Sequence, residues 1–143
     1  MSVFFDTNVI VYALLDDDDV KKRTAAALIA KAIDKGAFRI SAQVLKELAN
    51  TLIRKTDKSP QSIMLSVRRL APYVAIGDSP QLVIRALELR SEFALQFFDA
   101  LIIASAEASE CNLLISEDMS DGAVYGRVVV RNPFVTSFSV SFD

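Results

Sequence analysis

The sequence predicts an α/β fold in three layers, with a central, mostly parallel sheet of four to five strands flanked by helices. Short β-rich runs alternate with longer helical runs, which is typical of a parallel sheet with helical crossovers. The candidate strands are continuous apolar runs, as expected when both faces of a sheet are covered. The chain has 143 residues, 52% of them hydrophobic, and is long enough for one domain with an ordinary core.

Strand candidates are spread along the chain. Four segments have the clearest strand composition: Val3–Phe5, Phe38–Ile40, Leu113–Ile115 and Arg127–Val130. Tyr73–Ile76 is a weaker fifth candidate. No internal repeat or linker interrupts them, so we expect residues 1–143 to form a single domain.

Helices are expected between these strands. Four segments combine helix-favouring residues with apolar positions about 3.6 apart: Ala25–Ile33, Val44–Ile53, Leu82–Leu95 and Asp99–Ala108. Two helix starts have a local signature, Ser59-Pro60 and Ser79-Pro80. In each pair the serine hydroxyl suits the N-cap, and the proline has the φ that the first helical position needs.

The residue types that the sequence lacks exclude several kinds of site. It has no histidine and no tryptophan, and Cys111 is its only cysteine. A Ser-His-Asp triad, a zinc finger and an internal disulfide are therefore excluded. No basic leader precedes the first apolar run, and stretches such as Val9–Leu15 are far shorter than the roughly 20 residues that span a bilayer. We expect a soluble, cytoplasmic protein that does not insert into a membrane.

Charge is unevenly distributed along a chain whose formal net charge is −2. Residues 39–69 hold seven Lys or Arg and two acids, whereas residues 70–126 hold two Arg and nine acids. Two interpretations are open: a basic surface that holds a polyanion beside an acidic metal centre, or two solvated helix faces. The run Asp16–Asp19 is interpreted as a solvated helix N-terminus, partly neutralised by basic residues 21–23.

Two acids follow predicted strands. Asp6 comes directly after the first strand, and Asp118 lies shortly after Leu113–Ile115. The carboxyl ends of parallel strands meet at one edge of a sheet, where ligands gather, so both are site candidates. Asp6 is equally suited to cap a helix or form a turn, and Asp121, followed by Gly122, is more simply a turn residue.

Two further acids lie within predicted helices. Asp99 falls between Ile102 and Ile103 on the helix surface, where a carboxylate is costly unless it caps the helix or binds a cation. Both interpretations of Asp99 are open. Spacing alone puts Glu47 on the flank of its helix and favours a solvated side chain.

Five motifs, taken together and in order, resemble the PIN domain family, specifically the VapC-type toxin ribonucleases of toxin–antitoxin pairs. They lie at residues 5–13, 41–48, 98–106, 114–119 and 130–134, and read FDTNVIVYA, SAQVLKEL, FDALIIASA, LISEDM and VRNPF. Each motif alone is weak, but all five occur in order with family-like spacing, and the resemblance extends over nearly the whole chain. The resemblance implies that residues 1–143 form a single PIN domain.

The resemblance also implies an active site in which four acids bind metal and act in catalysis: Asp6, Glu47, Asp99 and Asp118. Asn8 and Ser116 match polar positions that orient the carboxylates; Ser116 stands where the family commonly has Thr, and Phe98 where it often has Trp. Carboxylate oxygens suit Mg²⁺ or Mn²⁺, and a cation would offset the repulsion among crowded carboxylates. The implied activity is metal-dependent endoribonucleolytic cleavage by a metal-activated water, leaving 5′-phosphate and 3′-hydroxyl ends.

RNA is the implied substrate, and basic residues are candidates for contacts with its phosphates: Arg39, Lys46, Arg54 and Lys55, with Lys58, Arg68 and Arg69. The resemblance further implies a homodimer and a cognate antitoxin protein that inserts a segment into the active site. A toxin and a housekeeping RNA-processing nuclease are both compatible with the sequence.

Two other functions fit parts of the sequence. Phosphoaspartate folds also place an Asp after the first strand, but the dehalogenase-like type needs a second Asp where Asn8 stands, and the receiver type needs a Lys where Ser116 stands. A PIN-like scaffold that acts mainly through partner binding is the second alternative. The alternating Phe138, Val140 and Phe142 suit an extra edge strand or an interface.

Overall fold

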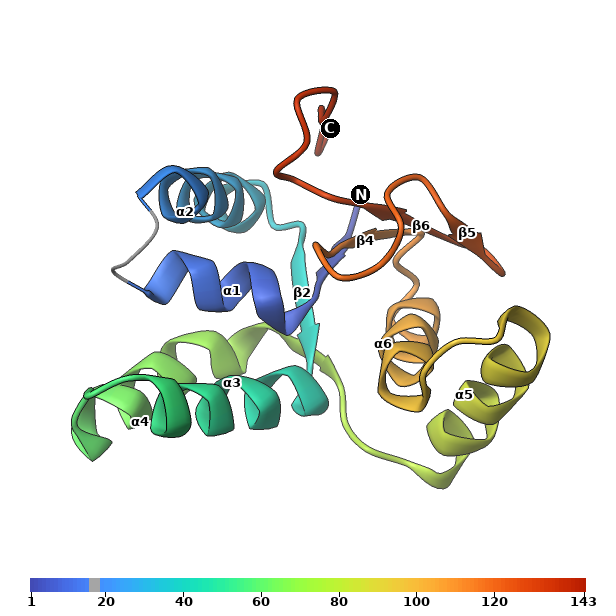
Figure 1. The fold of residues 1–143 in the computed structure, drawn as a ribbon, viewed down its shortest axis with the longest axis horizontal. Helices are drawn as coiled ribbons and strands as arrows, with labels where there is room; N and C mark the ends of the chain where they lie inside the picture. The colour runs from blue at the N-terminus through green and yellow to red at the C-terminus, as the bar shows by residue number, and fades with distance from the viewer. Residues whose placement is uncertain (16–18) are drawn as a thin grey trace.

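A central sheet organises the computed structural model, which describes residues 1–15 and 19–143 (Figure 1). Its six strands within these residues are β1 (Val3–Phe5), β2 (Phe38–Ser41), β3 (Val74–Ile76), β4 (Leu113–Ile115), β5 (Val124–Tyr125) and β6 (Val128–Arg131). Their order across the sheet is β3-β2-β1-β4-β6-β5. Every neighbouring pair is parallel except β5 and β6. The predicted mostly parallel sheet is confirmed.

The five predicted strands are all present, with ends that differ by at most one residue. The sixth strand, β5, was not predicted. It has two residues and forms an antiparallel hairpin with β6 through Gly126, whose φ of 61° suits glycine. Its Val124 side chain is 56% exposed, so a two-residue, half-covered edge strand has no apolar run to reveal it.

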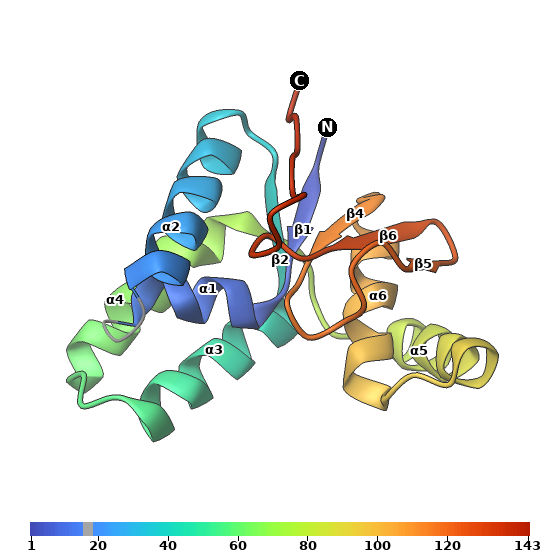
Figure 2. The ribbon, with the colours of Figure 1, turned by 45° about the horizontal axis from the view of Figure 1, so that its top comes forward.

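Six α-helices surround the sheet in the described residues: α1 (Thr7–Leu14), α2 (Asp19–Asp34), α3 (Ala42–Lys55), α4 (Pro60–Leu70), α5 (Pro80–Phe93) and α6 (Phe97–Ala108). Figures 1 and 2 show α1 to α4 on one side of the strands and α5 with α6 on the other. A short 3₁₀ turn, Ala71–Tyr73, leads into β3. The arrangement has the three layers that the sequence predicts.

Both predicted serine caps are confirmed. The Ser59 hydroxyl accepts a hydrogen bond from the Ser62 backbone N–H at 3.1 Å, and the Ser79 hydroxyl accepts one from Leu82 N–H at 3.2 Å. One helix, α1, was not predicted. It packs against both α2 and α3 and is apolar on several sides, so it shows no single stripe of apolar positions.

The core consists of the central strands and the helix faces turned toward them. Phe4, Phe38, Leu48, Ile103 and Leu114 are all fully buried in it. Within the described residues, no helix is long and apolar enough to cross a membrane.

The C-terminal segment does not form the edge strand that its alternating sequence suggested. Residues 132–143 form no strand. Phe142 is buried, and Phe138 and Val140 are half-buried against the core of the same chain. The alternation therefore reflects side chains that cover the protein's own core.

Removing the Ser79 cap is expected to lower the free energy of unfolding by about 1 kcal/mol, because the Leu82 N–H loses its acceptor in Ser79→Ala. Ser91→Ala is the matched control: Ser91 is exposed inside the same helix, where alanine favours helix formation. Urea unfolding followed by circular dichroism measures both. Equal losses in the two variants would contradict the capping role.

Candidate active site

Asp6 lies at the carboxyl edge of the sheet, directly after β1, and is only 6% exposed. Its Oδ1 accepts a hydrogen bond from the Thr7 backbone N–H at 2.8 Å, and its Oδ2 accepts one from the Ser116 hydroxyl at 2.8 Å. Asp6 is also the N-cap residue of α1. The interpretation of Asp6 as a helix cap is confirmed, and its place at the carboxyl edge of the sheet leaves it a candidate for the functional site.

Asn8 links the first strand end to the loop after β4. Its Nδ2 lies 3.4 Å from Asp6 Oδ2 and 3.3 Å from the Ser116 hydroxyl, while its Oδ1 accepts from the Glu117 backbone N–H at 3.2 Å. Asn8 and Ser116 thus both contact the Asp6 carboxylate. These bonds fix the orientation of a buried carboxylate.

Glu47 is half-buried on α3 and is not the solvated side chain that spacing alone favoured. Its Oε1 accepts from Gln43 Nε2 at 2.6 Å, and its Oε2 accepts from the Thr7 hydroxyl at 3.0 Å. The flank of α3 that carries Glu47 is covered because α1 packs against it. Spacing within one helix does not reveal a second helix on its flank.

Asp99 is the third residue of α6, and the N-cap of that helix is Gln96. The interpretation of Asp99 as a helix cap is therefore wrong. Its side chain is half-buried. Asp118 is exposed and lies in the loop after β4, two residues beyond Ser116.

These four carboxylates line one cleft of about 660 Å³, together with Asn8 and Lys55. The pKa of Asp6 is raised to about 6, chiefly by burial and to a smaller extent by the negative charges of Glu47 and Asp118, while its hydrogen bonds with Ser116 and Thr7 act in the opposite direction. The pKa of Asp99 is also raised, by burial first and then by Asp118 and Glu47. The four acids come from four separate segments of the chain, and the charges of Glu47 and Asp118 act on both Asp6 and Asp99.

The donor set of this cleft fits a divalent cation chemically. Carboxylate oxygens are hard ligands, and a cation would remove the mutual repulsion that raises the pKa values of Asp6 and Asp99. In the part of the chain that the structure describes, no three such groups are already close enough together to enclose an ion. Mg²⁺ usually keeps several water ligands and binds through one or two carboxylates, so the cleft would not need three acids in direct contact with the ion.

The predicted RNA-contact residues occupy different places. Lys55, at the end of α3, lines the acidic cleft. Lys46 forms an ion pair with Asp78 beside a neighbouring cavity, and Arg54 is exposed on α3. Arg39 donates to the backbone carbonyls of residues 36 and 38 and is not among the residues that line the cleft.

Two acidic motifs do not belong to the cleft as described. Asp121 is a turn residue, as expected, and its Oδ1 accepts from Arg131 Nε and from the Asn132 backbone N–H. The run Asp16–Asp19 falls mainly on residues 16–18, outside the described residues, and Asp19 begins α2.

Sequence reasoning missed two polar residues that hold the site together, Gln43 and Thr7. Both donate to the Glu47 carboxylate. The i,i+4 spacing of Gln43 and Glu47 was a usable signal for the first of these bonds. Nothing in the sequence pairs Thr7 with Glu47, because that contact depends on how α1 packs on α3.

The sequence was compared with models of known protein families and with curated proteins. A family model described as the PIN domain matches residues 3–120. A search of curated proteins finds no match.

Several solved structures have a similar fold, and three of them are described as toxins or toxin–antitoxin complexes. A toxin–antitoxin complex from Klebsiella pneumoniae is 21% identical with a TM-score of 0.70, covering 93% of this chain and 98% of its own. VapBC2 from Rickettsia felis, bound to a promoter DNA fragment, is 22% identical with a TM-score of 0.64, covering 92% and 98%. Mycobacterium tuberculosis VapC20, a toxin that cleaves the sarcin-ricin loop, is 20% identical with a TM-score of 0.64, covering 79% and 87%.

Proposed function

The chain belongs to the PIN domain family, and on that basis we propose that it is a metal-dependent endoribonuclease of the VapC type, the toxin of a toxin–antitoxin pair. One observation carries the proposal. Asp6, Glu47, Asp99 and Asp118, from four separate segments, line one cleft in a chain that has no histidine for acid–base or metal chemistry.

The four carboxylates are the groups that would hold Mg²⁺ or Mn²⁺ in this cleft. When bound, the cation supplies a more acidic water and compensates negative charge on the phosphate and the leaving oxygen. Neighbouring residues of the protein hold two of these carboxylates in place. Ser116 and the Thr7 backbone N–H orient the Asp6 carboxylate, and Glu47 is fixed from two sides.

RNA is the substrate that we assign to the cleft. Lys55 brings a positive charge to its wall, where it can contact a phosphate group. Single-stranded or looped RNA is expected, because one phosphodiester must reach the carboxylates. The similar fold of VapC20, described as cleaving the sarcin-ricin loop, supports an RNA substrate but does not identify this one.

The proposed protein partners are an antitoxin and a second copy of the chain. The similar fold of proteins found in toxin–antitoxin complexes supports the antitoxin. An exposed apolar stripe on α5, formed by Val83, Ile84 and Leu87, supports a homodimer. Sedimentation velocity of the purified chain is expected to give the mass of a dimer, and Leu87→Glu is expected to shift it toward the monomer; a wild-type monomer would contradict the homodimer.

Cleavage of a mixed cellular RNA pool tests the proposed function. The purified chain, freed of any bound inhibitor, is incubated with Mg²⁺, with Mn²⁺ or with EDTA. Discrete RNA fragments with 5′-phosphate ends are expected with either metal and none with EDTA. Identical background in all three reactions would contradict the nuclease and make partner binding the leading account.

A further inference from the structure

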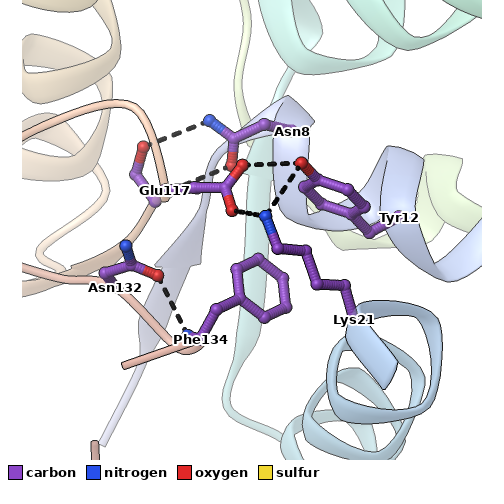
Figure 3. Close-up of polar contacts among 7 residues, drawn as sticks. Asn8, Tyr12, Lys21, Glu117, Asn132 and Phe134 are labelled. Atoms are coloured by element: carbon purple, nitrogen blue, oxygen red, sulfur yellow. Dashed lines mark hydrogen bonds and ion pairs between the residues drawn. The ribbon is translucent and has the colours of Figure 1, made fainter. Parts of the chain in front are cut away.

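Glu117 lies between two residues of the candidate site, Ser116 and Asp118, but its side chain has other partners. Its Oε1 accepts a hydrogen bond from the Tyr12 hydroxyl at 2.7 Å, and its Oε2 forms an ion pair with Lys21 Nζ at 2.5 Å. Figure 3 shows these two residues reaching Glu117 from α1 and α2. The loop after β4 is thereby connected to two helices on one side of the sheet.

Aromatic rings help to hold Lys21 in this position. Its ammonium group lies 4.8 Å from the centre of the Tyr12 ring and 5.3 Å from that of Phe134, and the two rings pack edge to face at 5.1 Å. The hydrogen bond to Glu117 raises the pKa of Lys21, which further favours the charged form of the side chain. Lys21 is a cation with a defined place beside the site.

The backbone of the same loop is fixed on both sides of Asp118. The Glu117 N–H donates to Asn8 Oδ1 at 3.2 Å, and Met119, on the other side, is buried. Among the described residues, no hydrogen bond holds the Asp118 carboxylate itself, and that residue is exposed. The position of Asp118 therefore depends on how firmly its neighbours are held.

We propose that Lys21 and Tyr12 are positioning residues for Asp118. By binding both oxygens of the Glu117 carboxylate, they hold residues 116–118 with Asp118 at the cleft and keep Glu117 from competing for the cation. Residues that orient metal ligands from outside commonly change metal affinity about 10-fold or more when they are replaced. This inference rests on the proposed function, because it requires Asp118 to be a ligand of the divalent cation.

The affinity for Mn²⁺, measured by isothermal titration calorimetry on the full chain without RNA, tests the proposal. Lys21→Met is expected to weaken Mn²⁺ binding about 10-fold, whereas Lys21→Arg, which keeps the charge, stays within about threefold of wild type. Lys31→Met is the matched control: it makes the same change in charge on the same helix, but Lys31 faces the Phe142 ring. Its Mn²⁺ affinity is expected to equal that of wild type.

A second variant separates positioning from loss of folding. Tyr12→Phe keeps the aromatic ring and removes only the hydroxyl that contacts Glu117, so a measurable loss of Mn²⁺ affinity with an unchanged melting temperature supports the proposal. Unchanged Mn²⁺ affinity in Lys21→Met overturns it. Tighter binding also overturns it, because Glu117 would then be a ligand that Lys21 restrains. If wild type binds no Mn²⁺, the proposed function itself fails together with this role.

Discussion

Replacing Asp6 by Asn is expected to reduce RNA cleavage by at least about 100-fold. Asp6 is the most buried of the four carboxylates, and its two oxygens are held by Ser116 and Thr7 in a fixed orientation. Asparagine has the same shape but no charge, so the fold is kept while the cluster loses one anionic ligand. Loss of a direct ligand is expected to cost at least as much as loss of the groups that orient it.

The control for this experiment is Asp57→Asn, the same chemical change at an exposed residue that does not line the cleft. Its initial rate of cleavage, followed on a labelled RNA with Mg²⁺ in excess, is expected to match that of wild type. Full activity of Asp6→Asn in the same assay would mean that the cleft is not the site of cleavage.

The second large effect is on stability and depends on pH. Burial is the main cause that raises the pKa of Asp6 from 3.8 to about 6. Between about pH 4 and pH 6 the native state therefore binds more protons than the unfolded state, and stability falls as the pH rises. At pH 7 the ionised Asp6 lowers the free energy of unfolding of the metal-free protein by about 3 kcal/mol, since each unit of pKa shift corresponds to about 1.4 kcal/mol.

Asp6→Asn is expected to remove this loss of stability, because asparagine carries no charge at any pH. In EDTA, the stability of the variant relative to that of wild type should rise by about 2–3 kcal/mol between pH 4 and pH 7. Urea unfolding at the two pH values gives the difference. A gap between the two proteins that stays constant with pH would show that Asp6 does not titrate in this range. Mg²⁺ is expected to stabilise wild type more than the variant, because a ligand that binds the native state raises its stability.

The sequence predicted best those parts of the fold that depend on residues close together in the chain. Buried parallel strands are continuous apolar runs, so Val3–Phe5 and Leu113–Ile115 were placed without error. The caps at Ser59 and Ser79 depend on two adjacent residues. Helix α1 and strand β5 were missed because one is covered on several sides and the other is two residues long.

Residues of the candidate site could be predicted where their position depends on nearby sequence, and could not where it depends on contacts between distant segments. Asp6 and Asp118 follow from strand ends and the rule that parallel strands share a carboxyl edge. Glu47 was identified only through family resemblance, because its contact with Thr7 joins two helices 40 residues apart. Lys21 could not be found at all, since its contact with Glu117 spans 96 residues and follows from no motif or period.

Direct binding of Mn²⁺ tests most sharply whether these four carboxylates together hold a divalent cation. Calorimetric titration of wild type, Asp6→Asn, Asp99→Asn and the control Asp57→Asn in one buffer at pH 7.5 compares them. We expect Mn²⁺ to bind wild type and Asp57→Asn alike, and to bind both cleft variants at least about 10-fold more weakly. Equal Mn²⁺ affinity in all four proteins, or none in wild type, would contradict the metal centre and the nuclease mechanism built on it.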